Sequence, residues 1–384
     1  MLYCDNAATT GMEHEALCEM LPYMREKFGN PSSVYGFSDA PREGIRKARM
    51  QVAHLIGAKP EEIYFTSGGS ESDNWALKGT YYKVMRTRNM RRPHIITTQI
   101  EHHAILHTAK FLEQQGARVT YLPVNENGLV SIQQLRKAIT SDTVLISVMT
   151  ANNEIGTIEP IQEIGTIAKE HNILFHTDAV QAFGQIPLWV DALQVDMLSA
   201  SAHKVHGPKG CGMLYIREGC EPDNYLHGGG QEKGLRGSTE NVPSIVGFGK
   251  ACEIAEKHME ERMQYLAKLR NYMIRRILYE IPYTRLNGDC NKRLPGNVSI
   301  AFQYVDGNSL LAMLDEKGVY ASAGSACNAS NHSISHVLKA IGLPEPLAVG
   351  TIRFTLSEKM KKSDIDNLIT ILKYAVMELR KNNS

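Results

Sequence analysis

The chain has 384 residues, and 43% of them are hydrophobic, which is enough for two domains or for one large α/β body with a smaller partner. The formal net charge is only +1, so there is no electrostatic reason to expect direct binding to nucleic acid or to an acidic membrane. The apolar runs are strand-sized and far shorter than the roughly 20 residues that a membrane span needs.

The amino terminus and the cysteines both favour a cytoplasmic protein. Residues 1–10 lack the basic region and apolar stretch of a signal peptide. The seven cysteines are an odd number and form no CxxC pair, which argues against a disulfide framework and against a structural zinc site. We therefore predict a cytoplasmic location and no bound metal.

Hydrophobic patterning indicates helices over residues 12–28 and 40–56, followed by alternating strands and helices. The expected strands are short and apolar, over residues 62–66, 94–98, 118–123, 143–149, 173–178, 195–202 and 210–217. Helical patterns separate several of them, over residues 71–88, 102–115, 132–139 and 161–171. This alternation predicts an α/β fold whose mostly parallel sheet is covered by helices on both faces, with ligands bound outside the carboxyl ends of the strands.

The pattern changes near residue 250, which indicates a second, smaller α+β domain. Residues 246–281 form a long amphipathic helical pattern, and beyond it strands are expected at 297–302 and 350–355. Helices are expected at 309–317 and from residue 363. We predict a large domain over residues 12–255 and a small domain that combines residues 1–11 with residues 256–384.

Lys204 lies between two strand-like segments, beside a histidine and a Gly-Pro turn. A lysine is most often a solvated surface charge. Here the apolar segments on either side place the amine at the rim of a sheet, where removal from water lowers its pKa and favours action as a nucleophile or base.

Four strand ends before Lys204 carry groups that would suit one ligand. Residues 66–72 open directly onto a helix and could bind a phosphate, or could be an ordinary serine cap. His102 could stack on a planar ring and move a proton, or could simply cap a helix. The asparagines within residues 150–156 could donate to a ligand oxygen, and Asp178 needs a cationic partner such as a protonated pyridine. Together with Lys204, these groups are the set that pyridoxal 5'-phosphate (PLP) requires.

Two further residues lie in the second half of the chain. Cys327 is in a loop of small and polar residues, without the apolar neighbours of a core cysteine, and is a candidate nucleophile. Arg353 lies inside an apolar strand, where a guanidinium group is seldom unpaired. Its partner could be a substrate carboxylate or an internal carboxylate.

These motifs resemble those of the NifS/IscS-type cysteine desulfurases, which are class V, fold-type I PLP enzymes. The resemblance runs from residue 5 to residue 354 through DNAATT (5–10), GNPSS (29–33), FTSG (65–68), EH (101–102), NNEIG (152–156), HTDAVQ (176–181), SAHK (201–204), GGGQE (228–232), GSAC (324–327) and IRF (352–354). The GSAC loop with its longer downstream segment is similar to the first group of these enzymes.

The resemblance implies conversion of L-cysteine to L-alanine with a persulfide on Cys327, carried by the small domain, while the large domain binds PLP. It implies that Lys204 binds the cofactor covalently, that Asp178 pairs with its pyridinium nitrogen and that His102 stacks on the ring and handles protons. The remaining implied contacts are Gln181 to the phenolic oxygen, Asn153 and Arg353 to the substrate, Asn153 also to the cofactor, and Gly69, Ser70, Ser201 and His203 to the phosphate.

Thr239 would reach the phosphate of a neighbouring subunit, which implies a homodimer. The sulfur would pass to an acceptor protein, either an iron–sulfur scaffold or a tRNA-thiolation enzyme, and a role in selenium metabolism stays open. Tyr35, Ser38 and Ser238 depart from the family pattern, which affects the local backbone and the phosphate contacts.

Two other functions compete with this interpretation. A class V aminotransferase or a β-lyase would share Lys204 and Asp178 but would have no use for Cys327. A non-catalytic scaffold on the same fold would bind no cofactor.

Overall fold

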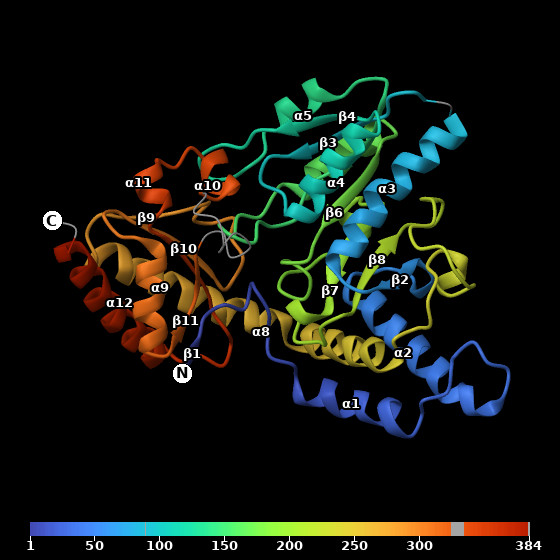
Figure 1. Cartoon of the computed structure of the whole chain (residues 1–384), viewed down its shortest axis with the longest axis horizontal. Helices are drawn as coiled ribbons and strands as arrows, with labels where there is room; N and C mark the ends of the chain where they lie inside the picture. Colours follow the sequence, from blue (N-terminus) through green and yellow to red (C-terminus); the bar gives the residue numbers. More distant parts are fainter. Residues whose placement is uncertain (89, 324–333, 383–384) are drawn as a thin grey trace.

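The computed structural model describes residues 1–88, 90–323 and 334–382, and a seven-stranded sheet lies at its centre (Figure 1). The strands follow the order β2-β8-β7-β6-β5-β3-β4. Their bounds are β2 (Ile63–Thr66), β3 (His94–Thr98), β4 (Arg118–Leu122), β5 (Thr143–Ser147), β6 (Leu174–Asp178), β7 (Met197–Ser201) and β8 (Gly212–Ile216). Only β8 runs antiparallel to its neighbours, so the predicted mostly parallel sheet is confirmed.

Helices cover both faces of this sheet because successive strand residues point to opposite sides. Ile95 and Leu145 pack with α3 (Gly69–Arg88) and α4 (His103–Gln114). Their neighbours Ile96 and Ile146 pack on the other face, with α2 (Asp39–Leu55), α5 (Ile132–Ala138) and α6 (Ile161–Glu170). The expected α/β architecture with two covered faces is thus confirmed.

A smaller sheet in the order β12-β13-β10-β9 lies beside the large one, in the orange and red part of Figure 1. Its strands are β9 (Thr284–Leu286), β10 (Asn297–Phe302), β12 (Ser322–Ala323) and β13 (Thr351–Thr355). It packs with α9 (Gly307–Glu316) and α12 (Lys362–Asn382) around its own group of buried apolar side chains. The first residues of the chain join this region, since β1 (Leu2–Tyr3) pairs with β11 (Val319–Tyr320) and Asp5 bridges to Thr355.

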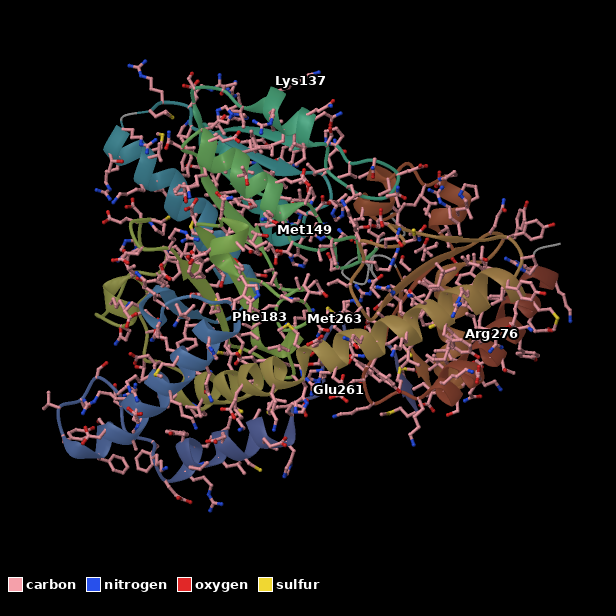
Figure 2. The ribbon with its side chains drawn as sticks, turned by 180° about the vertical axis from the view of Figure 1, so that it is seen from behind. Lys137, Met149, Phe183, Glu261, Met263 and Arg276 are labelled. Carbon is pink, nitrogen blue, oxygen red and sulfur yellow. The ribbon has the colours of Figure 1, made fainter. Side chains whose placement is uncertain are left out.

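A single 39-residue helix, α8 (Val242–Glu280), contributes to both groups of buried side chains. Figure 2 shows it crossing the molecule, with Glu261, Met263 and Arg276 labelled along it. Its first half packs so closely on α2 that a Cβ atom on Gly249 would lie 2.5 Å from the Cα atom of Ala48.

Most predicted elements are confirmed, with boundaries shifted by a few residues. Helix α8 begins four residues earlier than expected because the side chain of Asn241 accepts a hydrogen bond from the Ser244 N–H and caps it. Helices α10 (His336–Ala340) and α11 (Glu345–Ala348) and the two-residue strands were not predicted, because they are too short to show a period. Among the described residues, no helix combines the length and apolar character needed to cross a bilayer.

The structure shows an unusual local feature at Ser238 and at Ser38, two of the positions that depart from the family pattern. Ser238 has a φ of 100°, in the region that favours glycine. Ser38 is buried, and its hydroxyl has no hydrogen-bond partner among the described residues.

Glu159 is a buried carboxyl that holds the segment after β5 against the segment after β4. Its Oε2 atom accepts a 3.0 Å hydrogen bond from the Val130 N–H, whereas Oε1 has no partner in the described chain. Burial raises the pKa of Glu159 to about 8. The folded protein therefore keeps a proton that the unfolded chain loses above its ordinary pKa of 4.5, so stability falls as the pH rises through this window.

We predict that Glu159→Gln removes this loss, because glutamine keeps an acceptor for Val130 but carries no charge. The variant should gain stability over the wild type as the pH rises from about 5 to about 8, by up to about 1.4 kcal/mol per unit. Chemical denaturation at several pH values measures this gain. The control is Glu163→Gln on the exposed side of α6, and a gain that does not depend on pH would contradict the prediction.

Candidate active site

A cavity of about 290 Å³ lies at the carboxyl edge of the large sheet, where α/β proteins bind their ligands. The segments that follow β2, β3, β5, β6 and β7 all contribute to it. The amino-terminal segment and β13 of the small sheet complete its wall through Ala7, Ala8 and Arg353.

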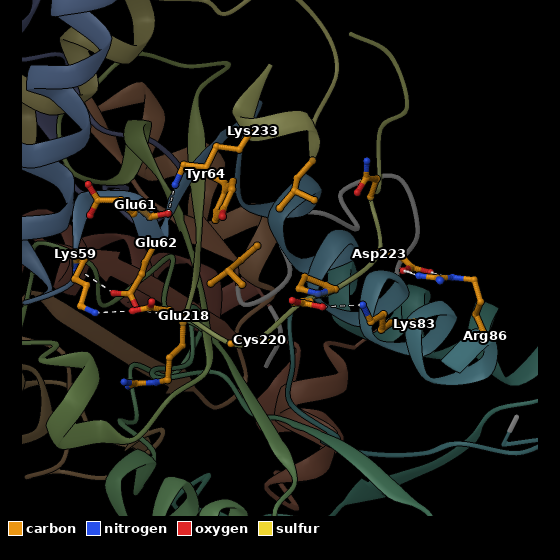
Figure 3. A pocket seen from close by; sticks show the side chains of 17 residues that line it. Lys59, Glu61, Glu62, Tyr64, Lys83, Arg86, Glu218, Cys220, Asp223 and Lys233 are labelled. Atoms are coloured by element: carbon orange, nitrogen blue, oxygen red, sulfur yellow. Dashed lines mark hydrogen bonds and ion pairs between the residues drawn. The ribbon is translucent and has the colours of Figure 1, made fainter. Parts of the chain in front are cut away.

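A larger hollow of about 730 Å³ lies at the opposite edge of the sheet, before β2 and after β8 (Figure 3). Its charged side chains are paired with one another, as in Lys59 with Glu218 at 2.6 Å and Lys83 with Glu221 at 3.0 Å. Cys220 also lines it, and burial raises the pKa of this thiol to about 12, which makes it a poor nucleophile. The smaller cavity is therefore the candidate site.

The predicted anion site forms one end of this cavity. Gly69 and Ser70 are the first residues of α3, where backbone N–H groups have no partner within the helix and the dipole favours an anion. They also line an adjoining open hollow with Ser201 and His203. A Cβ atom on Gly69 would lie 2.6 Å from the Cγ2 atom of Val180, so the close approach at this turn requires glycine.

His203 borders the anion site as a neutral imidazole. Its Nδ1 atom lies 3.1 Å from the hydroxyl of Thr9. Burial and the nearby positive charges of Lys204 and Lys209 lower the pKa of His203 to about 4. It can therefore offer a hydrogen bond to a phosphate without first carrying a charge.

Asp178 is the last residue of β6 and is only 5% exposed. One carboxyl oxygen accepts a 2.9 Å hydrogen bond from the Val180 N–H. Burial raises the pKa of this carboxyl, and the neighbouring His102 and Lys204 side chains oppose the rise. A carboxylate placed here is therefore suited to a cationic ligand atom.

Lys204 ends a short 3-10 helix (Ala202–Lys204) after β7, and its amine reaches the amino-terminal segment. Nζ donates to the carbonyl oxygens of Ala7 and Ala8, the latter at 2.7 Å. The side-chain amide of Gln181 also donates to Ala7, at 3.1 Å. The surface-charge interpretation of Lys204 is wrong, because its ammonium group is bound inside the cavity.

His102 caps α4, and it also lines the cavity. Its Nδ1 atom accepts a 3.1 Å hydrogen bond from the Ala104 N–H. His102 can therefore cap the helix and also face a ligand, because the hydrogen bond at Nδ1 holds the ring where it lines the cavity.

The turn after β5 contains two asparagines with different surroundings. Asn152 is buried and holds the turn together, with its side-chain oxygen accepting from the N–H groups of Glu154 and Ile155. Asn153 lines the cavity, and its backbone carbonyl accepts a 3.0 Å hydrogen bond from Arg353.

Arg353 forms an internal ion pair as well as lining the cavity. Its Nη2 atom lies 2.7 Å from the Oδ1 atom of Asp5. The buried Nε atom has no hydrogen-bond partner among the described residues. Each Nη atom carries two N–H groups, and the contacts with Asn153 and Asp5 use one of each, so the guanidinium group keeps donors for a ligand while Asp5 holds it in place.

The cavity brings together most of the predicted site residues, namely Gly69, Ser70, His102, Asn153, Asp178, Gln181, Ser201, His203, Lys204 and Arg353. Thr239 is exposed and does not line the cavity of this single chain. Cys327 lies outside the described residues.

Several lining residues were missed from the sequence, among them Asp73, His103, Glu154 and His336. His336 is in α10, a helix too short to predict. Asp73 is one turn beyond the predicted anion site, and helical periodicity from Gly69 could have placed it on the same face.

The comparisons with known proteins agree with this geometry. The family model "Aminotransferase class-V" matches residues 2–368. A protein named cysteine desulfurase IscS, from Methanosarcina thermophila, is 52% identical over 379 residues, which are 99% of this chain and 93% of that protein.

Solved structures of related proteins also match this chain over most of its length. A NifS-like protein matches with a TM-score of 0.91 at 38% identity and covers 98% of this chain and 99% of its own. A structure of SspA in complex with cysteine matches with a TM-score of 0.82 at 40% identity and covers 93% and 99% of the two chains.

The fold is that of a fold-type I enzyme. The chain belongs to the class-V aminotransferase family and, within it, to the cysteine desulfurases. These enzymes depend on PLP, and the residues present fit that group. Gly69 and Ser70 offer the N–H groups of a helix start to a phosphate, Asp178 is a buried carboxyl suited to a pyridinium nitrogen, and Lys204 lines the same cavity.

Proposed function

We propose that this PLP-dependent enzyme converts L-cysteine to L-alanine and holds the released sulfur as a persulfide on Cys327. The observation that carries the proposal is the joint presence of Lys204, Asp178, His102 and Arg353 around one cavity. When bound, PLP supplies an electron sink that makes the Cα proton of an amino acid removable.

The chain's own residues would hold the cofactor by both of its ends. Gly69, Ser70, Ser201 and His203 would donate to the phosphate, and Thr239 of a neighbouring subunit would reach the same group. Asp178 would keep the ring nitrogen protonated, which maximises its ability to withdraw electrons. Gln181 would contact the phenolic oxygen, Asn153 would also contact the cofactor, and His102 would cover one face of the ring.

Substrate binding and proton transfer would fall to three side chains. Arg353 would bind the carboxylate of L-cysteine through the unused N–H groups of its Nη atoms, with Asn153 beside it. The Lys204 amine would remove the Cα proton, and His102 would assist in moving protons between the ring and the substrate. The Ala7 and Ala8 carbonyls orient the Lys204 amine by hydrogen bonds.

Sulfur transfer would use the Cys327 thiolate as the nucleophile. The thiolate attacks the substrate sulfur, an S–S bond forms and the C–S bond breaks. The carbon atom that loses sulfur takes up a proton, so the products are alanine and a persulfide on Cys327. No external oxidant or reductant is needed, because the electron pair of the broken C–S bond stays with the carbon, which is reduced while the two sulfur atoms are oxidised to the persulfide level.

The wider setting is also part of the proposal. Residues 12–255 would act as the PLP-binding domain, and residues 1–11 with 256–384 as the small domain that carries Cys327. The enzyme would be a cytoplasmic homodimer that passes sulfur to an iron–sulfur scaffold or a tRNA-thiolation enzyme, without binding nucleic acid directly or inserting into a membrane.

The persulfide is tested by mass measurement after addition of L-cysteine. The wild type should gain about 32 Da, one sulfur atom, on the peptide that contains Cys327. Cys327→Ser should lose the adduct and alanine formation but keep the absorbance of bound PLP, and Cys290→Ser, at an exposed cysteine, is the matched control. Full turnover by Cys327→Ser would favour a β-lyase instead.

Arg353 is tested by a substitution that keeps its charge. Arg353→Lys should raise KM for L-cysteine by about tenfold to a hundredfold, because lysine cannot reproduce the guanidinium geometry, while PLP affinity stays unchanged. Asp5→Asn is the control for the internal ion pair, because it leaves the arginine in place. An unchanged KM in Arg353→Lys would mean that the arginine serves only that ion pair.

A further inference from the structure

Asp73 is a second buried acid in the cavity, and none of the roles above uses it. It lies in the first turns of α3, lines the cavity together with Asp178 and is 1% exposed. Its Oδ1 atom is buried and has no hydrogen-bond partner among the described residues. An ionised carboxylate in such a position would be costly unless a cation balanced it.

The basic side chain beside Asp73 cannot provide that balance. The Nε2 atom of His176 lies 3.8 Å from Oδ1 of Asp73. Both ring nitrogens of His176 are already held by hydroxyl groups, Nδ1 by Ser147 and Nε2 by Ser199, each at 2.9 Å. Burial lowers the pKa of His176 to about 3, so the imidazole is neutral.

The ionisable groups that interact with Asp73 are acidic, whereas Lys204 acts on the neighbouring Asp178. Burial and the charges of Asp178 and Glu101 raise the pKa of Asp73 well above its ordinary range, with the Ser199 hydroxyl as the opposing influence. His102 and Lys204 lower the pKa of Asp178 instead. Two interacting buried carboxyl groups do not both ionise readily, and the positive charge of Lys204 favours ionisation of Asp178.

We propose that Asp73 is held as a neutral carboxylic acid, which leaves Asp178 as the single carboxylate available to the cofactor nitrogen. The inference rests on the proposed role of Asp178 toward PLP and extends it to a residue with no assigned role. It follows from the placement of the two acids around one cavity, the orphaned oxygen of Asp73 and the neutral histidine beside it.

The consequence is an asymmetry between two similar substitutions. Asparagine resembles a neutral carboxylic acid in size and charge. Asp73→Asn should therefore bind PLP within about threefold of the wild type. Asp178→Asn removes the charge that faces the ring nitrogen, and it should weaken PLP binding about a hundredfold.

The protonation state itself is measured by infrared spectroscopy of the holoenzyme labelled with 13C at the aspartate carboxyl. The wild type should show a band of a protonated, labelled aspartic acid at pH 7, and Asp73→Asn should lose it. Absence of the band in the wild type, or its persistence in Asp73→Asn, would overturn the proposal. The wild-type spectrum alone is decisive if a variant fails to fold.

The two measurements also separate this inference from the proposed function. If Asp178→Asn binds PLP normally, the role assigned to Asp178 is wrong. The proposal that Asp73 stays neutral so that Asp178 alone is ionised is then wrong as well. If Asp178→Asn binds poorly and the infrared band is missing, the proposed function stands and only the neutral state of Asp73 is wrong. A large loss of PLP affinity in Asp73→Asn would likewise show that Asp73 is ionised in the native enzyme.

Discussion

A carboxyl group buried at the end of β6 is the constraint on which the site depends. Asp178 is removed from water, and a negative charge there is costly without a positive partner. Lys204 provides part of that charge from the end of β7. The parallel sheet makes this possible because it gathers the ends of β6 and β7 at one edge. In the proposed function, the cationic ring nitrogen of PLP would complete the balance.

The amino-terminal segment joins this edge to the small sheet. Ala7 and Ala8 accept hydrogen bonds from Lys204, and Asp5, two residues earlier, forms the ion pair with Arg353. The lysine and the arginine are therefore held by one short stretch of chain, although 149 positions separate them in the sequence. Helix α8 links the same two regions on another side, as Figure 2 shows. Together these links keep the guanidinium group of Arg353 at a fixed place relative to the Lys204 amine.

The sequence predicted the sheet and the helices on its faces from periodicity, and strand ends pointed to His102, Asp178 and Lys204, because these are local signals. The individual phosphate and ring contacts, such as Gln181 and His203, were expected only from the family resemblance. It could not predict the antiparallel direction of β8 or the carbonyl partners of Lys204, which depend on how distant segments meet. Asp73 was missed for a related reason: an acid near a helix start is usually a solvated cap, and only the packed structure shows it buried. The Thr239 contact requires a second subunit, and Cys327 lies outside the described residues, so both stay predictions.

The attachment of the cofactor to Lys204 is the claim on which the account depends most directly. Reduction of the purified enzyme with borohydride, followed by proteolysis and mass spectrometry, locates the lysine that carries the pyridoxyl group. The account predicts the label on Lys204, with none on Lys209, which borders the adjoining hollow. A pyridoxyl group on any other lysine, or a bound cofactor that leaves Lys204 unmodified, would contradict it.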